Sequence, residues 1–78
     1  MPRSTKRLPV AAAFGARVRK LREEQGWSQM SFADEAGMHF TMISSVERGE
    51  RNVSLVTIVR LAQGLKVDPG ILVEGLQV

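Results

Sequence analysis

The chain has 78 residues, no cysteine and a single histidine, which is the length of one small domain and excludes a disulfide framework, a thiolate zinc site and a metal site built on histidine alone. The formal net charge is +3, and the excess lies at the start: residues 1–22 contain seven basic and no acidic side chains, whereas residues 23–78 contain four basic and eight acidic ones. A basic segment of this kind fits a polyanionic partner, and a solvated tail followed by a charged helix surface explains it as well.

A basic arm, residues 1–8, precedes the predicted domain, residues 9–78. Pro9 suits the first turn of a helix, because its missing N–H is not needed there. Apolar residues then recur at helical spacing as far as Gly26. This pattern predicts a first helix that begins at Pro9 and is closed by Gly26.

Two short helices follow, joined at a glycine. Ser28 is a suitable N-cap for the second helix, and Gly37 ends this helix and lets the backbone turn sharply. The third helix is expected from about His39 to Arg48. Two helices of this length, joined at a wide angle by a glycine-containing turn, form a helix-turn-helix. The free face of its second helix carries short hydroxyl side chains, which can hydrogen-bond to base edges.

The remaining residues predict two more helices. Asp68 followed by Pro69 is a strong start signal for a fifth helix, expected from about Pro69 to Leu76. Ser54 caps the fourth helix, whose inner face has three- and four-residue spacing and consists of Leu55, Ile58, Leu61, Ala62 and Leu65. Since no strand is expected, the predicted fold class is an all-α domain of five helices with a helix-turn-helix.

From Phe14 to Leu76 the sequence closely resembles the XRE family of helix-turn-helix DNA-binding domains, which have the lambda-repressor-like fold. The matching residues are 18–29, VRKLREEQGWSQ, and 43–52, ISSVERGERN. The turn in the second segment is also similar to that of restriction–modification controller proteins. The resemblance implies a sequence-specific transcriptional regulator whose third helix lies in the major groove of double-stranded DNA. It also implies a homodimer on a palindromic operator, with half-sites about 34 Å apart.

Nine residues are predicted to contact DNA, from their positions and from the resemblance: Gln29, His39, Phe40, Thr41, Ser44, Ser45, Arg48, Arg51 and Asn52. Gln29 begins the second helix, where its amide and free backbone N–H groups can hold a phosphate; the alternative is an exposed polar residue. The hydroxyl groups on the third helix can donate to or accept from base edges. Arg48, Arg51 and Asn52, after this helix, are expected near the sugar–phosphate backbone, and the alternative for them is a surface charge cluster with Glu50. Arg51 alternatively reaches a groove edge.

Three residues have open placements. Phe40 stands where the family usually has a polar or basic residue, and it either packs on a thymine methyl group or folds back onto the domain, near Met38 or Met42. Met42 is either exposed beside the groove or partly buried. His39 is the expected N-cap of the third helix, where a local turn or a phosphate contact is favoured over a pH-sensitive or metal role.

Six residues are assigned to structure and assembly. The resemblance places an ion pair at Arg22 and Glu47, which implies a structural role for both. The fifth helix has too many apolar residues for one face of a short helix. Some of them are therefore expected at a dimer interface and others against the first helix, and the residues concerned are Ile71, Leu72, Val73 and Leu76.

Other functions have little support in the sequence. No nucleophile elbow, glycine-rich phosphate loop or paired-carboxylate arrangement points to catalysis, so we expect no enzyme activity, metal, cofactor or small-molecule ligand. The longest apolar run, residues 9–14, is too short for a membrane span or a secretory signal, so the expected location is the cytoplasm, at the nucleoid. A protein-interaction module, such as a co-regulator or antitoxin, is the alternative, and the apolar Phe40 and Met42 support it.

Overall fold

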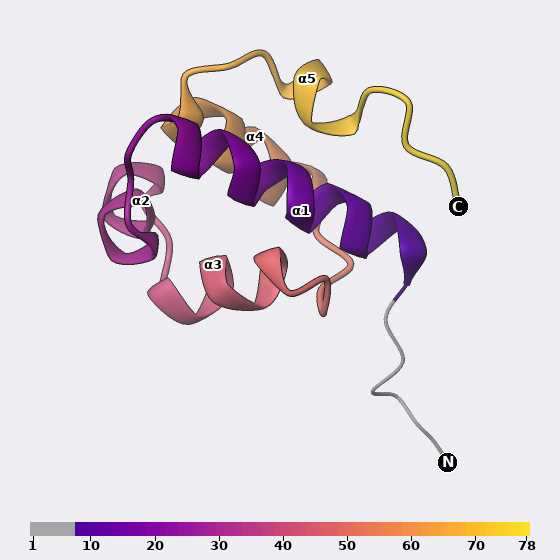
Figure 1. Ribbon diagram of the computed structural model, residues 1–78, viewed down its shortest axis with the longest axis horizontal. Helices are drawn as coiled ribbons and strands as arrows, with labels where there is room; N and C mark the ends of the chain where they lie inside the picture. Colours follow the sequence, from indigo (N-terminus) through magenta and orange to yellow (C-terminus); the bar gives the residue numbers. More distant parts are fainter. Residues whose placement is uncertain (1–7) are drawn as a thin grey trace.

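The computed structural model describes residues 8–78, and this part of the chain contains five helices and no strand. In Figure 1, α1 crosses the middle of the fold, with α2 and α3 on one side of it and α5 on the other. The predicted all-α fold is confirmed, whereas residues 1–7 of the predicted arm lie outside the described residues. None of the helices in residues 8–78 has the length and apolar character needed to cross a membrane. The helices are α1 (Pro9–Glu24), α2 (Gln29–Ala36), α3 (Phe40–Glu47), α4 (Leu55–Leu65) and α5 (Pro69–Val73).

Three helices begin at the capping residues that the sequence indicates, and α2 ends at the predicted glycine. The hydroxyl of Ser28 accepts a hydrogen bond from a backbone N–H in the first turn of α2, and the hydroxyl of Ser54 does the same in α4. Asp68 caps α5 by accepting the N–H of Gly70 at 2.8 Å. Gly37 has a φ of 67° and ends α2 in the left-handed conformation.

The last helix is shorter than predicted. α5 ends at Val73, not near Leu76. One terminal nitrogen of Arg17, on α1, donates to the backbone oxygens of Ile71, Leu72 and Glu74, the last at 2.6 Å. This cation satisfies carbonyl groups at the end of α5 that a further helical turn would use.

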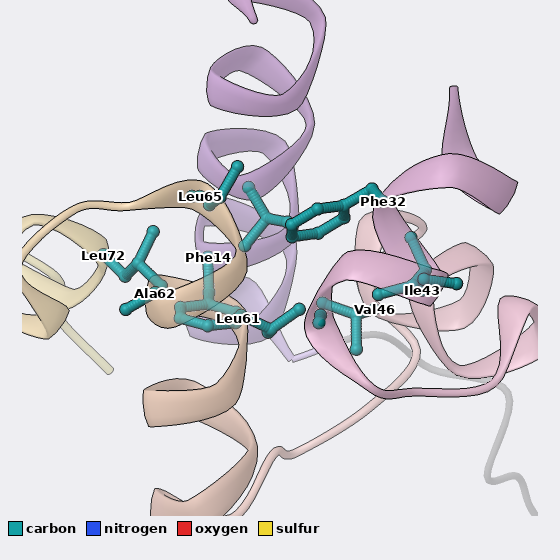
Figure 2. Packing of buried hydrophobic residues seen from close by; sticks show 11 residues of the cluster. Phe14, Phe32, Ile43, Val46, Leu61, Ala62, Leu65 and Leu72 are labelled. Atoms are coloured by element: carbon teal, nitrogen blue, oxygen red, sulfur yellow. The ribbon is translucent and has the colours of Figure 1, made fainter. Parts of the chain in front are cut away.

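One core joins all five helices. Figure 2 shows side chains from each of them converging, with Phe14 from α1, Phe32 from α2 and Leu72 from α5 among them. Leu72 has no exposed surface. Leu72 is therefore a core residue, and the prediction that it lies at a dimer interface is wrong. Leu55 was predicted on the inner face of α4, but its side chain is 76% exposed, because α4 meets the core only further along its length.

Two glycines allow α1 to pass very close to the end of α3. A Cβ atom added to Gly15 would lie 2.0 Å from the backbone oxygen of Val46. A Cβ atom on Gly49 would lie 2.7 Å from the Cα of Ala12, and Gly49 also has a positive φ of 75°. Only glycine fits such an approach without displacing backbone. The position of α3 against α1 therefore depends on these two residues.

The substitution Gly15→Ala is expected to destabilise the domain by about 1–3 kcal/mol, because the added methyl group overlaps the α3 backbone. Helix propensity alone predicts the opposite, since alanine is favoured over glycine in a helix interior by about 1 kcal/mol. Urea denaturation followed by circular dichroism measures the change. The exposed neighbour is the control, because Ala16→Gly reports propensity without the overlap. A Gly15→Ala variant more stable than the parent would contradict the close approach.

Candidate nucleic-acid interface

The helix α3 has one buried and one outward face. Ile43 and Val46 are almost completely buried, with exposed fractions of 0% and 1%. Thr41 is exposed on the opposite side and Ser44 is half-buried there, whereas Phe40, three residues before Ile43, is exposed at the edge of this face. Residues four apart on a helix lie one above the other. The outward face therefore presents the hydroxyl groups of Thr41 and Ser44, with the apolar ring of Phe40 at its edge.

The structure shows the surroundings of Met42 and Phe40. Met42 is partly buried and packs against the core. Phe40 is 43% exposed and borders a surface hollow together with Met38 and Met30, whose side chain is 67% exposed. The ring of Phe40 thus lies at the edge of the outward face, where both a base and a protein partner have access to it.

A buried ion pair holds α3 to α1. The Nε and Nη2 atoms of Arg22 donate to the two carboxylate oxygens of Glu47 at 2.6 Å and 3.0 Å. The third donor group of Arg22 binds the backbone oxygen of Trp27 at 2.7 Å. The two side chains are only 9% and 3% exposed. The pair that the resemblance implies is present, in the bidentate geometry that gives the strongest ion pairs.

The protonation of Arg22 does not limit this ion pair near neutral pH. The hydrogen bond with Glu47 raises the pKa of Arg22 above its ordinary value, although burial acts in the opposite direction. A group whose pKa is raised in the folded state contributes its full stabilisation below its unfolded pKa and loses it only as the pH rises through the folded pKa. For an arginine, this range lies in strong alkali.

Gln29 extends the ion pair to α2. Its amide nitrogen donates to the same Glu47 carboxylate at 2.9 Å, so its side chain does not stand free in solvent. The backbone N–H groups of Gln29 and Met30 have no hydrogen-bond acceptor in residues 8–78. They lie at the positive end of the helix dipole, where an anion is stabilised.

Ser45 is not available to a base. Its side chain is buried, and its hydroxyl donates to the backbone oxygen of Met42 at 3.1 Å. The hydroxyl oxygen of Ser45 in turn accepts a hydrogen bond from the Nε of Arg51 at 3.1 Å. Because a hydroxyl has one proton, Ser45 has no donor left. The structure therefore contradicts the predicted base contact and makes Ser45 a positioning residue for Arg51, whose terminal nitrogens have no partner in residues 8–78.

Arg48 differs from Arg51 because all three of its donor groups are engaged. Its Nε and Nη2 atoms each donate to one oxygen of Glu50 at 3.0 Å. Its Nη1 atom donates to the hydroxyl of Ser44 at 2.6 Å. The hydrogen bond with Glu50 raises the pKa of Arg48 above its ordinary value. The predicted phosphate contact of Arg48 thus competes with a carboxylate that is already in place.

The two remaining predicted contacts are on the surface. His39 is the N-cap residue of α3, but its side chain makes no capping hydrogen bond. Asn52 is exposed next to Arg51 and borders a small hollow between α1 and α5. No group of three or more metal-ligating side chains occurs in residues 8–78.

The apolar surface of the domain is larger than the sequence indicates. Ile71 and Val73 on α5 are 44% and 41% exposed, whereas Leu76 is half-buried against the core. Leu55 and Val56, at the start of α4, are 76% and 63% exposed. Sequence reasoning missed this pair, because it placed Leu55 on the inner face of the fourth helix and gave Val56 no role.

The comparisons with known proteins agree with this geometry. Residues 18–72 match the helix-turn-helix family HTH_3, and the chain belongs to this family. It is similar to control protein C.BamHI of Bacillus amyloliquefaciens, with 42% identity over 61 residues that cover 77% of this chain and 75% of that protein. The crystal structure of the restriction–modification controller protein C.AhdI from Aeromonas hydrophila has a TM-score of 0.77 at 44% identity, and the match covers 80% of this chain and 94% of that one.

A third similar protein was solved with its ligand. The biofilm regulator SinR, in complex with DNA, has a TM-score of 0.75 at 29% identity, and the match covers 78% of this chain and 98% of that one. The resemblance to the XRE family and to controller proteins is thereby confirmed.

The substitution Glu47→Ala is expected to lower the free energy of unfolding by about 3 kcal/mol, because it leaves the buried guanidinium of Arg22 without its counter-charge. Glu35→Ala is the matched control, since Glu35 pairs with the exposed Lys66 and its removal costs at most about 1 kcal/mol. Urea denaturation of both variants gives the comparison. Equal losses in the two variants would show that the buried pair does not hold α3.

Proposed function

We propose that this chain is a sequence-specific regulator of transcription that binds double-stranded DNA with α3 in the major groove. The observation that carries the proposal is the outward face of α3, which presents the hydroxyl groups of Thr41 and Ser44 while the apolar side of the helix is buried. Uncharged hydroxyl groups hydrogen-bond to base edges without pairing indiscriminately with phosphates.

Phosphate-binding groups lie next to this face. The open backbone N–H groups at the start of α2 are those of Gln29 and Met30. The side chain of Gln29 is bonded to Glu47, the last residue of α3, so these groups lie near α3. The guanidinium of Arg51 lies beyond the other end of the helix-turn-helix, held at its Nε by Ser45. Such groups position a recognition helix on a duplex. The similarity to control proteins, and to SinR solved with DNA, supports the same role here.

The proposal includes a homodimer on a palindromic operator. Its support is the exposed apolar surface on α4 and α5, two helices that pack against each other. We define this surface as the α4–α5 patch, which consists of Leu55, Val56, Ile71 and Val73. Exposed apolar side chains on two helices in contact offer a surface that a second copy of the chain can cover. A protein with this role acts at the nucleoid, in the cytoplasm.

A protein-interaction module is the second candidate. The exposed Met30 and Phe40, around one hollow at the edge of α3, favour it. The salt dependence of duplex binding separates the two candidates, because only phosphate contacts make affinity for random duplex fall steeply with salt.

Random duplex is expected to bind with an affinity that decreases steeply with salt. In Arg51→Ala, the slope of log affinity against log salt should decrease by about one unit per bound subunit. Lys66→Ala is the charge-matched control, since Lys66 pairs with Glu35 at 3.2 Å and ends α4, away from α3. Fluorescence anisotropy at several salt concentrations gives the slopes. Absence of binding at low salt would reject the proposal in favour of an interaction module.

Base preference is expected to depend on Thr41. Thr41→Ala removes an exposed hydroxyl without a change of charge, so it should relax the selected sequence at one position of each half-site and leave the salt slope unchanged. Selection of bound sequences from a random duplex pool, for the parent and the variant, gives both half-sites and their palindromy. Identical sequences selected by the parent and the variant would show that Thr41 does not contact a base.

A charge in the α4–α5 patch is expected to separate the subunits. Leu55→Glu buries a carboxylate if the patch is an interface, so the dimer dissociation constant should rise by at least about tenfold, which corresponds to about 1.4 kcal/mol. Met30→Glu is the control, because it introduces the same charge at an equally exposed apolar residue outside the patch. Sedimentation velocity measures both. If Met30→Glu separates the subunits and Leu55→Glu does not, the interface lies elsewhere.

A further inference from the structure

We propose that Arg48 and Glu50 fix the hydrogen-bonding direction of Ser44, so that Ser44 recognises only a hydrogen-bond acceptor on a major-groove base edge. This inference rests on the proposed function, and it specifies how the recognition helix selects bases. In it, Ser44 is the residue that touches the base, and Arg48 and Glu50 are positioning residues that act through it.

The three side chains form a continuous chain of hydrogen bonds. The carboxylate of Glu50 holds two nitrogens of Arg48, and the third donor group of Arg48 binds the Ser44 hydroxyl at 2.6 Å. Ser44 and Arg48 are four residues apart, so both lie on the outward face of α3. The guanidinium is thereby fixed between a carboxylate in the following turn and a hydroxyl on the reading face.

This arrangement makes Ser44 a donor. A serine hydroxyl has one proton and two lone pairs, and an isolated one donates or accepts equally well. Here a cationic group already occupies the acceptor side of the oxygen. Its positive charge opposes the approach of a second donor and polarises the O–H bond. The hydroxyl proton has no acceptor within residues 8–78, so it is available to a ligand.

The chemistry of the major groove turns this into a base preference. Purine N7, guanine O6 and thymine O4 accept hydrogen bonds, whereas cytosine offers only its amino donor. The base that Ser44 touches is therefore any base except cytosine. Thr41 is different, because its hydroxyl has no hydrogen bond in residues 8–78 and remains free to donate or accept.

The same contacts separate the roles of the two arginines. Glu50 already holds the Nε and Nη2 edge of the Arg48 guanidinium, and its carboxylate repels a phosphate that approaches the same group. Arg51 is held only through its Nε and keeps both terminal nitrogens open. We therefore assign the phosphate contact to Arg51. Arg48, which was also predicted to contact phosphate, is instead a positioning residue for Ser44.

Selection from a random duplex pool tests the base preference. For the parent, cytosine should be absent at one position of each half-site, and Ser44→Ala should admit all four bases there. Arg48→Ala should admit cytosine at the same position, because the freed hydroxyl can then accept a hydrogen bond. Ser44→Thr keeps the hydroxyl and should restore the exclusion. Cytosine as the base that the parent selects at this position would overturn the proposal.

Base analogues identify the acceptor atom. Where selection gives a purine, a 7-deaza substitution should weaken binding of the parent about threefold to tenfold, the range for one neutral hydrogen bond. Where it gives thymine, an analogue that lacks O4 should do the same. Neither analogue should affect Ser44→Ala. An equal loss in the parent and in Ser44→Ala would show that Ser44 does not contact that atom.

The salt dependence separates this proposal from the proposed function. Arg48→Ala should leave the salt slope unchanged, whereas Arg51→Ala lowers it by about 0.9 per subunit. Glu50→Gln releases Arg48 and should steepen the slope. If Arg48→Ala instead matches Arg51→Ala and cytosine stays excluded, the chain still binds DNA but Arg48 is a phosphate contact, and the present proposal is wrong. If the parent binds no duplex at low salt, the proposed function itself fails.

Discussion

The Arg22–Glu47 ion pair is the constraint on which the rest of the structure depends. It joins the end of α1 to the end of α3, and Gln29 connects the same carboxylate to the first residue of α2. The third donor group of Arg22 binds the backbone just before α2. One carboxylate therefore connects three helices. Because the interaction is directional, it fixes the orientation of α3, which apolar packing alone leaves adjustable.

Local signals predicted the fold, and long-range contacts decided the parts that differ. The serine and aspartate caps and the left-handed Gly37 are properties of a few consecutive residues, so the sequence placed all of them correctly. The end of α5 depends on Arg17, which is more than 50 residues away in the chain. No window of sequence contains both partners, and for this reason the prediction extended the helix too far.

The candidate site shows the same division. The predicted outward face of α3 is correct for Thr41 and Ser44, because helical periodicity determines it. Periodicity cannot show that the hydroxyl of Ser45 donates to the backbone and accepts from Arg51. Nor does it show that Arg48 is bound to Glu50, since both interpretations of that charge cluster fit the sequence. Residue types identified the surface, and the hydrogen-bond partners determine which of its residues are free to act.

The hydrogen bonds from Arg17 to the end of α5 also affect how two subunits can be arranged. α1 contacts α3 through the two glycines and α5 through this arginine, so the recognition helix and α5 are both packed against the same helix. In a pair of subunits joined through the α4–α5 patch, the separation of the two reading helices is set by the width of the fold and not by a flexible linker. The dimensions of the domain then determine the spacing between half-sites. A regulator of this kind changes its target by exchanging side chains on α3, while the distance between the two halves of the target stays constant.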